Sequence, residues 1–109
     1  MNISGSTINV TSSVKNTNCA VFAESYITGE GNKAVINFTG TNTINSSRAN
    51  TVAGSADKNT YGLRAKGNAV VNGANNTTIT VTDETGCTIV VRGAELEDDY
   101  THQTGVIND

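Results

Sequence analysis

The sequence has no proline and no tryptophan, only two cysteines, and an aromatic content of 5% over 109 residues. Charged residues are also sparse, at 16%, and the formal net charge is −3. The seven basic residues are scattered and form no stripe that could follow a phosphate backbone, so nucleic acid is not an expected partner. No apolar run approaches the roughly 20 residues that cross a bilayer, and the opening MNISGSTINV lacks the charged and apolar regions of a signal peptide.

Threonine, asparagine and glycine are abundant instead. They disfavour helices, because threonine is β-branched, asparagine competes for backbone hydrogen bonds, and glycine loses backbone entropy on folding. The same residues suit short strands joined by turns. A chain of this length allows one domain with a modest core. The composition therefore predicts a single all-β domain.

Three short apolar phrases recur in a fixed order along the chain. The first phrase is TINVT (7–11), TINSS (43–47) and TITVT (78–82). The second is CAVFA (19–23), YGLRA (61–65) and CTIVV (87–91), and the third is AVIN (34–37), AVVN (69–72) and GVIN (105–108). The isoleucines of the first phrase stand at 8, 44 and 79, so the period is 36 and then 35 residues.

Self-similarity at this period predicts a solenoid, in which each unit buries its apolar face against its neighbours. Three strands per period and three periods predict a right-handed parallel β-helix of about three rungs, with equivalent strands about 4.8 Å apart. We expect one segment over residues 1–109, with rungs of roughly 7–38, 43–73 and 78–109. An antiparallel sandwich is the alternative, since NG at 72–73 suits a hairpin turn, but it leaves the fixed order of the phrases unexplained.

The alternation of side chains within each phrase predicts which residues face the core. The expected core columns are Ile8, Ile44 and Ile79 in the first phrase, Val21, Leu63 and Ile89 in the second, and Ile36, Val71 and Ile107 in the third. Other residues expected inside are Val10, Cys19, Ala23, Ala34, Phe38, Ser46, Tyr61, Ala65, Ala69, Val81, Cys87 and Val91. Asn37, Asn72 and Asn108 fall at one corner of successive rungs, which predicts a ladder of hydrogen-bonded amides along the axis.

No catalytic, cofactor-binding or metal-binding set is predicted. Cys19 and Cys87 are expected two rungs apart, about 9.6 Å, which is too far for a disulfide, so both are predicted to be free thiols. His102 is the only histidine, and no ligand spacing matches a metal site. The acidic run ELEDDY (95–100) is predicted to be a solvated loop, with a weak cation site as the alternative.

The stretch YGLRAKGN (61–68), the strands TINVT and TITVT, and the proline-free Thr/Asn/Gly background resemble passenger domains of bacterial autotransporters and related β-helical adhesins. The resemblance implies export through the outer membrane and display at the cell surface, in adhesion, aggregation or biofilm formation. It implies a non-enzymatic, rigid stalk with binding loops. Its partners would be host or bacterial surface glycans or proteins, or further copies stacked end to end. Because the sequence lacks a signal peptide and stops inside a repeat, we expect a fragment of a longer passenger.

Two other functions fit the same predicted fold. A carbohydrate-active β-helix enzyme, such as a polysaccharide lyase or hydrolase, would gather carboxylates on one outer face. The acids of this chain lie mostly in expected loops, and no two strands present them outward at matching positions. An ice-binding solenoid would present a regular threonine array. Thr78, Thr80 and Thr82 supply one row, but Asn9 and Asn45 interrupt it in the other two rungs.

Overall fold

The computed structural model describes residues 1–49 and 58–109, which contain strands and two short 3-10 turns but no α-helix. The strands are β1 (Asn2–Ser4), β2 (Thr7–Ser12), β3 (Asn18–Ser25), β4 (Ala34–Thr39), β5 (Asn42–Arg48), β6 (Thr60–Gly67), β7 (Ala69–Asn72), β8 (Thr77–Asp83), β9 (Ile89–Glu97), β10 (Gln103–Thr104) and β11 (Val106–Ile107). The 3-10 turns are η1 (Glu30–Asn32) and η2 (Ala74–Asn76).

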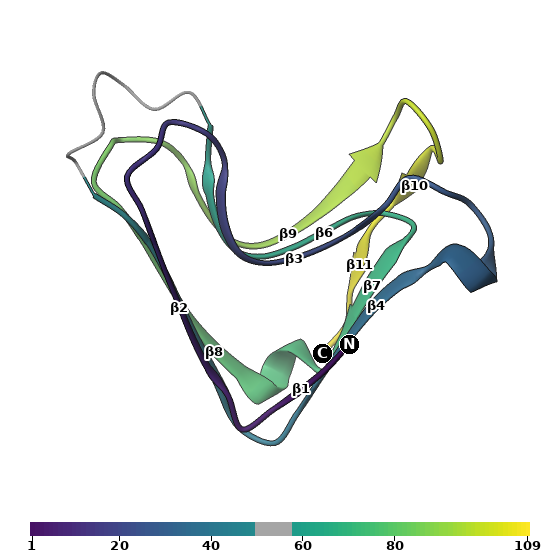
Figure 1. Cartoon of the computed structure of the whole chain (residues 1–109), viewed down its shortest axis with the longest axis horizontal. Helices are drawn as coiled ribbons and strands as arrows, with labels where there is room; N and C mark the ends of the chain where they lie inside the picture. The colour runs from purple at the N-terminus through teal and green to yellow at the C-terminus, as the bar shows by residue number, and fades with distance from the viewer. Residues whose placement is uncertain (50–57) are drawn as a thin grey trace.

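The strands form three sheets, which the chain visits in turn. The first sheet has the order β1-β4-β7-β11, the second β2-β5-β8, and the third β3-β6-β9, with β10 added beyond β9. Every pairing is parallel except that of β10 with β9. This confirms an all-β chain with parallel sheets, and the antiparallel sandwich is wrong, because successive long strands lie in different sheets. Figure 1 shows the third sheet bowed towards the other two, so that its outer surface is concave.

The first and second sheets are in the register that their phrases predict. Ile8, Ile44 and Ile79 stand opposite one another on β2, β5 and β8. Ile36 on β4 faces Val71 on β7, which faces Ile107 on β11. Ile44 and Val71 are completely buried. These columns form the apolar core between the sheets, with Val21, Phe38, Leu63 and Ala65 packed into it.

In the third sheet the predicted register of the last strand is wrong. Val21 stands opposite Leu63, but Leu63 stands opposite Arg92, and Ile89 lies opposite Thr60. Ile89 is 44% exposed and Val91 46%, whereas Cys87 precedes the strand altogether. Only Cys87 and Thr88 of CTIVV lie in the connection between β8 and β9, and Val90 rather than Cys87 stands opposite Tyr61, so the predicted alignment of CTIVV with YGLRA is three residues early.

Tyr61 and Cys19 lie outside the apolar core in which they are predicted, although Tyr61 is only 8% exposed, because β6 bends at Gly62 and both Gly62 and Leu63 face the core. A Cβ at Gly62 would lie 2.3 Å from Ile79 Cγ2, so Gly62 faces the core beside the completely buried Leu63. Tyr61 therefore faces outwards, and its ring centroid lies 4.6 Å from Arg64 Cζ. Cys19 pairs with Tyr61 and lies half-buried, and this burial raises the pKa of its thiol to about 11.

Buried polar side chains close the corners between sheets. Asn42 accepts a hydrogen bond from the Ser6 amide (3.0 Å) and donates to the carbonyls of Thr39 (2.9 Å) and Asn76 (3.3 Å). It thereby joins the turns of three successive passes. At another corner Asn68 joins two successive passes, donating to the carbonyls of Ile27 and Gly29 in the β3–η1 loop. Turn backbone that the strands leave unpaired thus gains partners inside the fold.

The described part of the chain, residues 1–49 and 58–109, contains no helix with the length and apolarity to cross a membrane.

Candidate functional site

The concave outer surface of the third sheet carries an ordered strip of aromatic and charged side chains. Side chains of a strand alternate between faces, so those next to the inward Val21 and Ala65 point outwards, and the bend at Gly62 places Tyr61 on the same side. The strip is made of Phe22 and Glu24 on β3, Tyr61, Arg64 and Lys66 on β6, and Glu95 and Glu97 on β9. The stacking of β3, β6 and β9 (Figure 1) brings these side chains together from three distant parts of the sequence.

Arg64 is the centre of this strip. Its Nη2 lies 2.6 Å and its Nε 3.0 Å from Glu95 Oε2. Its Cζ lies 4.6 Å from the ring centroids of both Phe22 and Tyr61, within cation–π range. Burial alone would raise the pKa of Glu95, but hydrogen bonds from Arg64 and Tyr61 outweigh it and hold the pKa below its usual range. Glu95 is therefore ionised at neutral pH and already forms an ion pair with Arg64.

Lys66 connects the strip to the turn that follows β9. Its Nζ lies 3.5 Å from Glu97 Oε2 and 4.0 Å from Glu24 Oε1. Glu97 is only 3% exposed, and its Oε1 accepts a hydrogen bond from the backbone amide of Asp99 (3.3 Å). This chain of contacts fixes the β9–β10 turn against the sheet.

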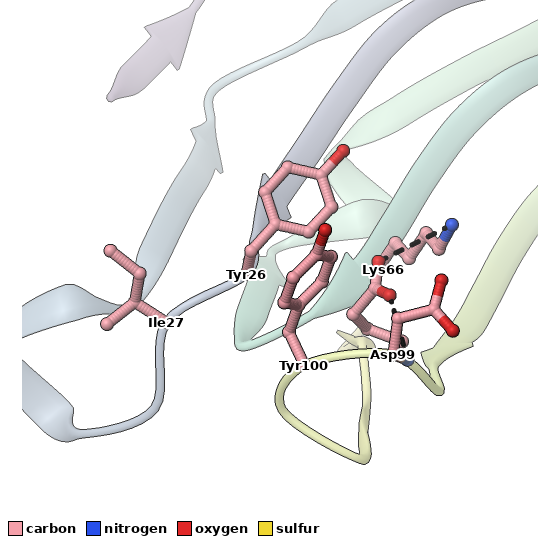
Figure 2. Close-up of a pocket in the computed structure, with 6 residues that line it drawn as sticks. Tyr26, Ile27, Lys66, Asp99 and Tyr100 are labelled. Atoms are coloured by element: carbon pink, nitrogen blue, oxygen red, sulfur yellow. Dashed lines mark hydrogen bonds and ion pairs between the residues drawn. The ribbon is translucent and has the colours of Figure 1, made fainter.

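Beside Lys66 the surface opens into a hollow of about 740 Å³. It is lined by Tyr26 and Ile27 from the β3–η1 loop, Lys66 from β6, and Glu97, Asp99 and Tyr100 from β9 and the turn after it. Figure 2 shows the Tyr26 and Tyr100 rings side by side, with Lys66 and Asp99 across from them. The ring centroids are 5.5 Å apart, with planes at 71°. Tyr26 remains 51% exposed and Tyr100 67% exposed.

The predicted solvated loop at ELEDDY is thus only partly correct. Its first three residues belong to β9, where Glu95 and Glu97 pair with Arg64 and Lys66. The run was assigned to a loop because charge runs usually face water, but each of these two carboxylates has a cation on the neighbouring strand. Among the residues described, 1–49 and 58–109, no group of three or more side chains could hold a metal ion.

The predicted asparagines of the first sheet do lie together. Asn72 Nδ2 donates to Asn37 Oδ1 (2.9 Å), and Asn108 Nδ2 donates to Asn72 Oδ1 (2.9 Å). Asn37 Nδ2 donates in turn to Asn2 Oδ1 (3.0 Å), which extends the ladder to a fourth residue that the sequence comparison missed. No disulfide joins Cys19 and Cys87 in the described residues.

The sequence reading also missed both Tyr26 and Tyr100. Tyr26 continues the alternation of Phe22 and Glu24 on β3, so a signal for its outward position was present. The sequence contains no such signal for Tyr100, because the position of Tyr100 depends on the register of β9 and on the hairpin with β10.

Comparison of the chain with family models, with curated proteins and with solved structures found no match.

Proposed function

We propose that the chain is a segment of a right-handed parallel β-helix that acts by binding rather than catalysis. In this proposal it belongs to a surface-exposed, adhesin-like passenger of the autotransporter kind, exported through the outer membrane. The stacked sheets serve as a rigid stalk, and the outer face of the third sheet and its loops contact surface glycans. The observation that carries the proposal is the outer face of the third sheet, where exposed aromatic rings lie beside charges that are already paired.

The paired charges favour binding over acid–base chemistry. A glycoside hydrolase needs one carboxyl group that stays protonated near neutral pH, and so a raised pKa. Here the pKa of Glu95 is held below its usual range and that of Asp83 at about 2. Glu95 forms an ion pair with Arg64, and Asp83 forms one with Arg48. Neither group is suited to donate a proton to a leaving sugar.

The regular stacking supports the stalk. In-register strands bury one column of apolar side chains inside and align one ladder of amides outside. Such a stack is stiff along its axis, because each layer is hydrogen-bonded to the next over its whole length. A stiff support holds binding loops at fixed spacing away from the surface that carries it.

The proposal is tested with the purified chain on immobilised glycans and on whole cells, alongside an assay for new reducing ends or unsaturated sugars. We expect binding to cells that falls after glycosidase treatment, with no release of product. Release of sugar by the wild-type chain at a rate that Glu95→Gln abolishes would overturn the non-enzymatic assignment. Arg64→Gln is the matched control, because it removes the same ion pair and leaves the carboxylate.

A further inference from the structure

We infer that the hollow beside Lys66 is a subsite for one neutral pyranose of a glycan, which stacks its C–H face on Tyr26 or Tyr100. This inference rests on the proposed function, since it names the ligand class and the residues of that binding face. It is carried by the two exposed rings, the polar groups opposite them and the charge of the lining.

The ring arrangement leaves stacking surface available. In the edge-to-face pair, the edge of one tyrosine ring meets the face of the other, and Tyr26 stays 51% and Tyr100 67% exposed. The face of an aromatic ring carries partial negative charge, which attracts the slightly positive C–H groups of a sugar ring. Ile27, which is 61% exposed, is a further apolar residue of the lining.

The polar groups stand where a stacked sugar would direct its hydroxyls. Lys66 and Asp99 lie on the side of the hollow opposite the rings (Figure 2), so this side offers a carboxylate acceptor and an ammonium donor, the latter also 3.5 Å from Glu97 Oε2. A few polar groups beside an aromatic wall are typical of small-molecule sites of about 300–1,000 Å³. The hollow, at about 740 Å³, has room for one or two sugar rings.

The charge of the lining favours a neutral ligand. Lys66 contributes one positive charge against the negative charges of Glu97 and Asp99, so the lining carries a net charge of −1. An acidic sugar would meet this excess of negative charge. Uronate-rich or sialylated glycans should therefore bind less well than neutral hexoses or N-acetylhexosamines.

The site is also held in place before any ligand arrives. The Tyr26 hydroxyl interacts with Glu24, which also approaches Lys66. The carboxylate of Glu97 fixes the turn that carries Tyr100, through the amide of Asp99. Little side-chain order would have to be gained on binding, which favours affinity for a small ligand.

The test uses tyrosine fluorescence of the intact chain, which has three tyrosines and no tryptophan to mask them. The probes are neutral cello-, xylo-, galacto- and chito-oligosaccharides, with polygalacturonate as the acidic probe. We expect at least one neutral probe to change the fluorescence saturably. Its binding should weaken at least about tenfold in Tyr100→Ala and in Tyr26→Ala, and within about twofold in Tyr100→Phe, which keeps the ring.

Val14→Ala is the control, since Val14 is an exposed apolar residue in the β2–β3 loop, outside the hollow. The thermal melt of each variant shows whether it has folded. Neutral-glycan binding that survives both alanine substitutions would overturn this subsite and leave the proposed function standing. Preference for polygalacturonate would overturn the charge argument and the subsite as stated. Failure of every probe, neutral and acidic, together with failure of the chain to bind cells, would overturn both proposals.

Discussion

The guanidinium of Arg48 contacts the carboxylate of Asp83 through two hydrogen bonds to Oδ2, from Nε at 3.0 Å and from Nη2 at 2.8 Å, with both side chains fully buried. Arg48 also donates to the carbonyls of Lys15 (3.3 Å), Asn16 (2.7 Å) and Lys58. One side chain thus joins the corners of three successive passes between the second and third sheets. The pair is a structural clamp with every strong donor of the guanidinium engaged.

Removal of one member of this clamp should be costly. We expect Arg48→Ala to lower the free energy of unfolding by about 3–5 kcal/mol, because it leaves Asp83 buried without its main cationic partner. Urea denaturation followed by circular dichroism measures the loss. Arg92→Ala is the control, since Arg92 makes a partly exposed ion pair with Asp109 and should cost much less. Equal losses in the two variants would contradict the clamp.

Stability should also depend on the ionisation of Asp83. Burial alone would raise its pKa, but hydrogen bonds from Thr60, Thr85 and Arg48 lower it from 3.8 to about 2. A carboxyl group with a depressed pKa stabilises the fold above its unfolded pKa and loses that contribution as the pH falls through its folded pKa. We therefore expect the melting temperature to fall between about pH 4 and pH 2.

Comparison with Asp83→Asn isolates this effect. The variant should start less stable at neutral pH, and its melting temperature should change less over the same acid range. A wild-type melt that does not vary from pH 5 to pH 2 would show that Asp83 has no such role.

Asn72 is one of the two inner members of the amide ladder, and its side chain makes one hydrogen bond to Asn37 and one to Asn108. Asn72→Ala removes both bonds and should cost about 1–2 kcal/mol of unfolding free energy, at about 1 kcal/mol for each bond. Asn16→Ala, at an exposed side chain, is the matched control. Chemical denaturation of the two variants gives the difference, and a loss no larger than the control would rule out a stabilising ladder.

Gly62 is required by close packing rather than by its backbone angles. A methyl group there would meet Ile79 Cγ2 at 2.3 Å and Val81 Cγ2 at 2.9 Å. Gly62→Ala should therefore destabilise the chain by about 1–3 kcal/mol through overpacking. Gly31→Ala is the control, because nothing lies within 4 Å of a Cβ at that position. A thermal melt of Gly62→Ala that matches wild type would contradict the inward bend of β6.

The outer strands of the second sheet offer a route to self-association. β2 and β8 each pair on one side only, with β5 between them. Strand edges with unused backbone groups pair readily with other chains. We expect the purified 109-residue chain to form larger species as its concentration rises, by sedimentation velocity. A monomer with a concentration-independent melt would contradict end-to-end stacking.

The first and second sheets could be predicted from sequence because their phrases recur at almost constant intervals. Ile8, Ile44 and Ile79 need only this spacing to be aligned. The sequence also contains a signal for the Arg48–Asp83 clamp. Arg48 directly follows TINSS and Asp83 directly follows TITVT, so the two stand at the same offset from Ile44 and Ile79. A charged pair at such positions is rarely buried, so the spacing alone does not predict that both side chains lie inside the fold.

The side-chain directions and the register of the third sheet could not be predicted in the same way, for two physical reasons. A bend at Gly62 breaks the two-residue alternation, so Tyr61 and Leu63 face opposite sides despite their spacing. Val21 and Arg92 follow Ile8 and Ile79 by 13 residues, whereas Leu63 follows Ile44 by 19, so the longer connection before β6 obscures the register of the second phrase. The hollow depends on the register of β9, because it brings Tyr26 to Tyr100 across 74 positions of sequence (100 − 26).

The amide ladder also has a direction. Asn37, Asn72 and Asn108 each donate through Nδ2 to the preceding member, and none of these bonds runs the other way. The ladder therefore ends in an amide NH₂ group at Asn2 and in an amide oxygen at Asn108. Each end of the stack therefore presents a different group to a further layer: an added amide would accept from Asn2 at one end and donate to Asn108 at the other.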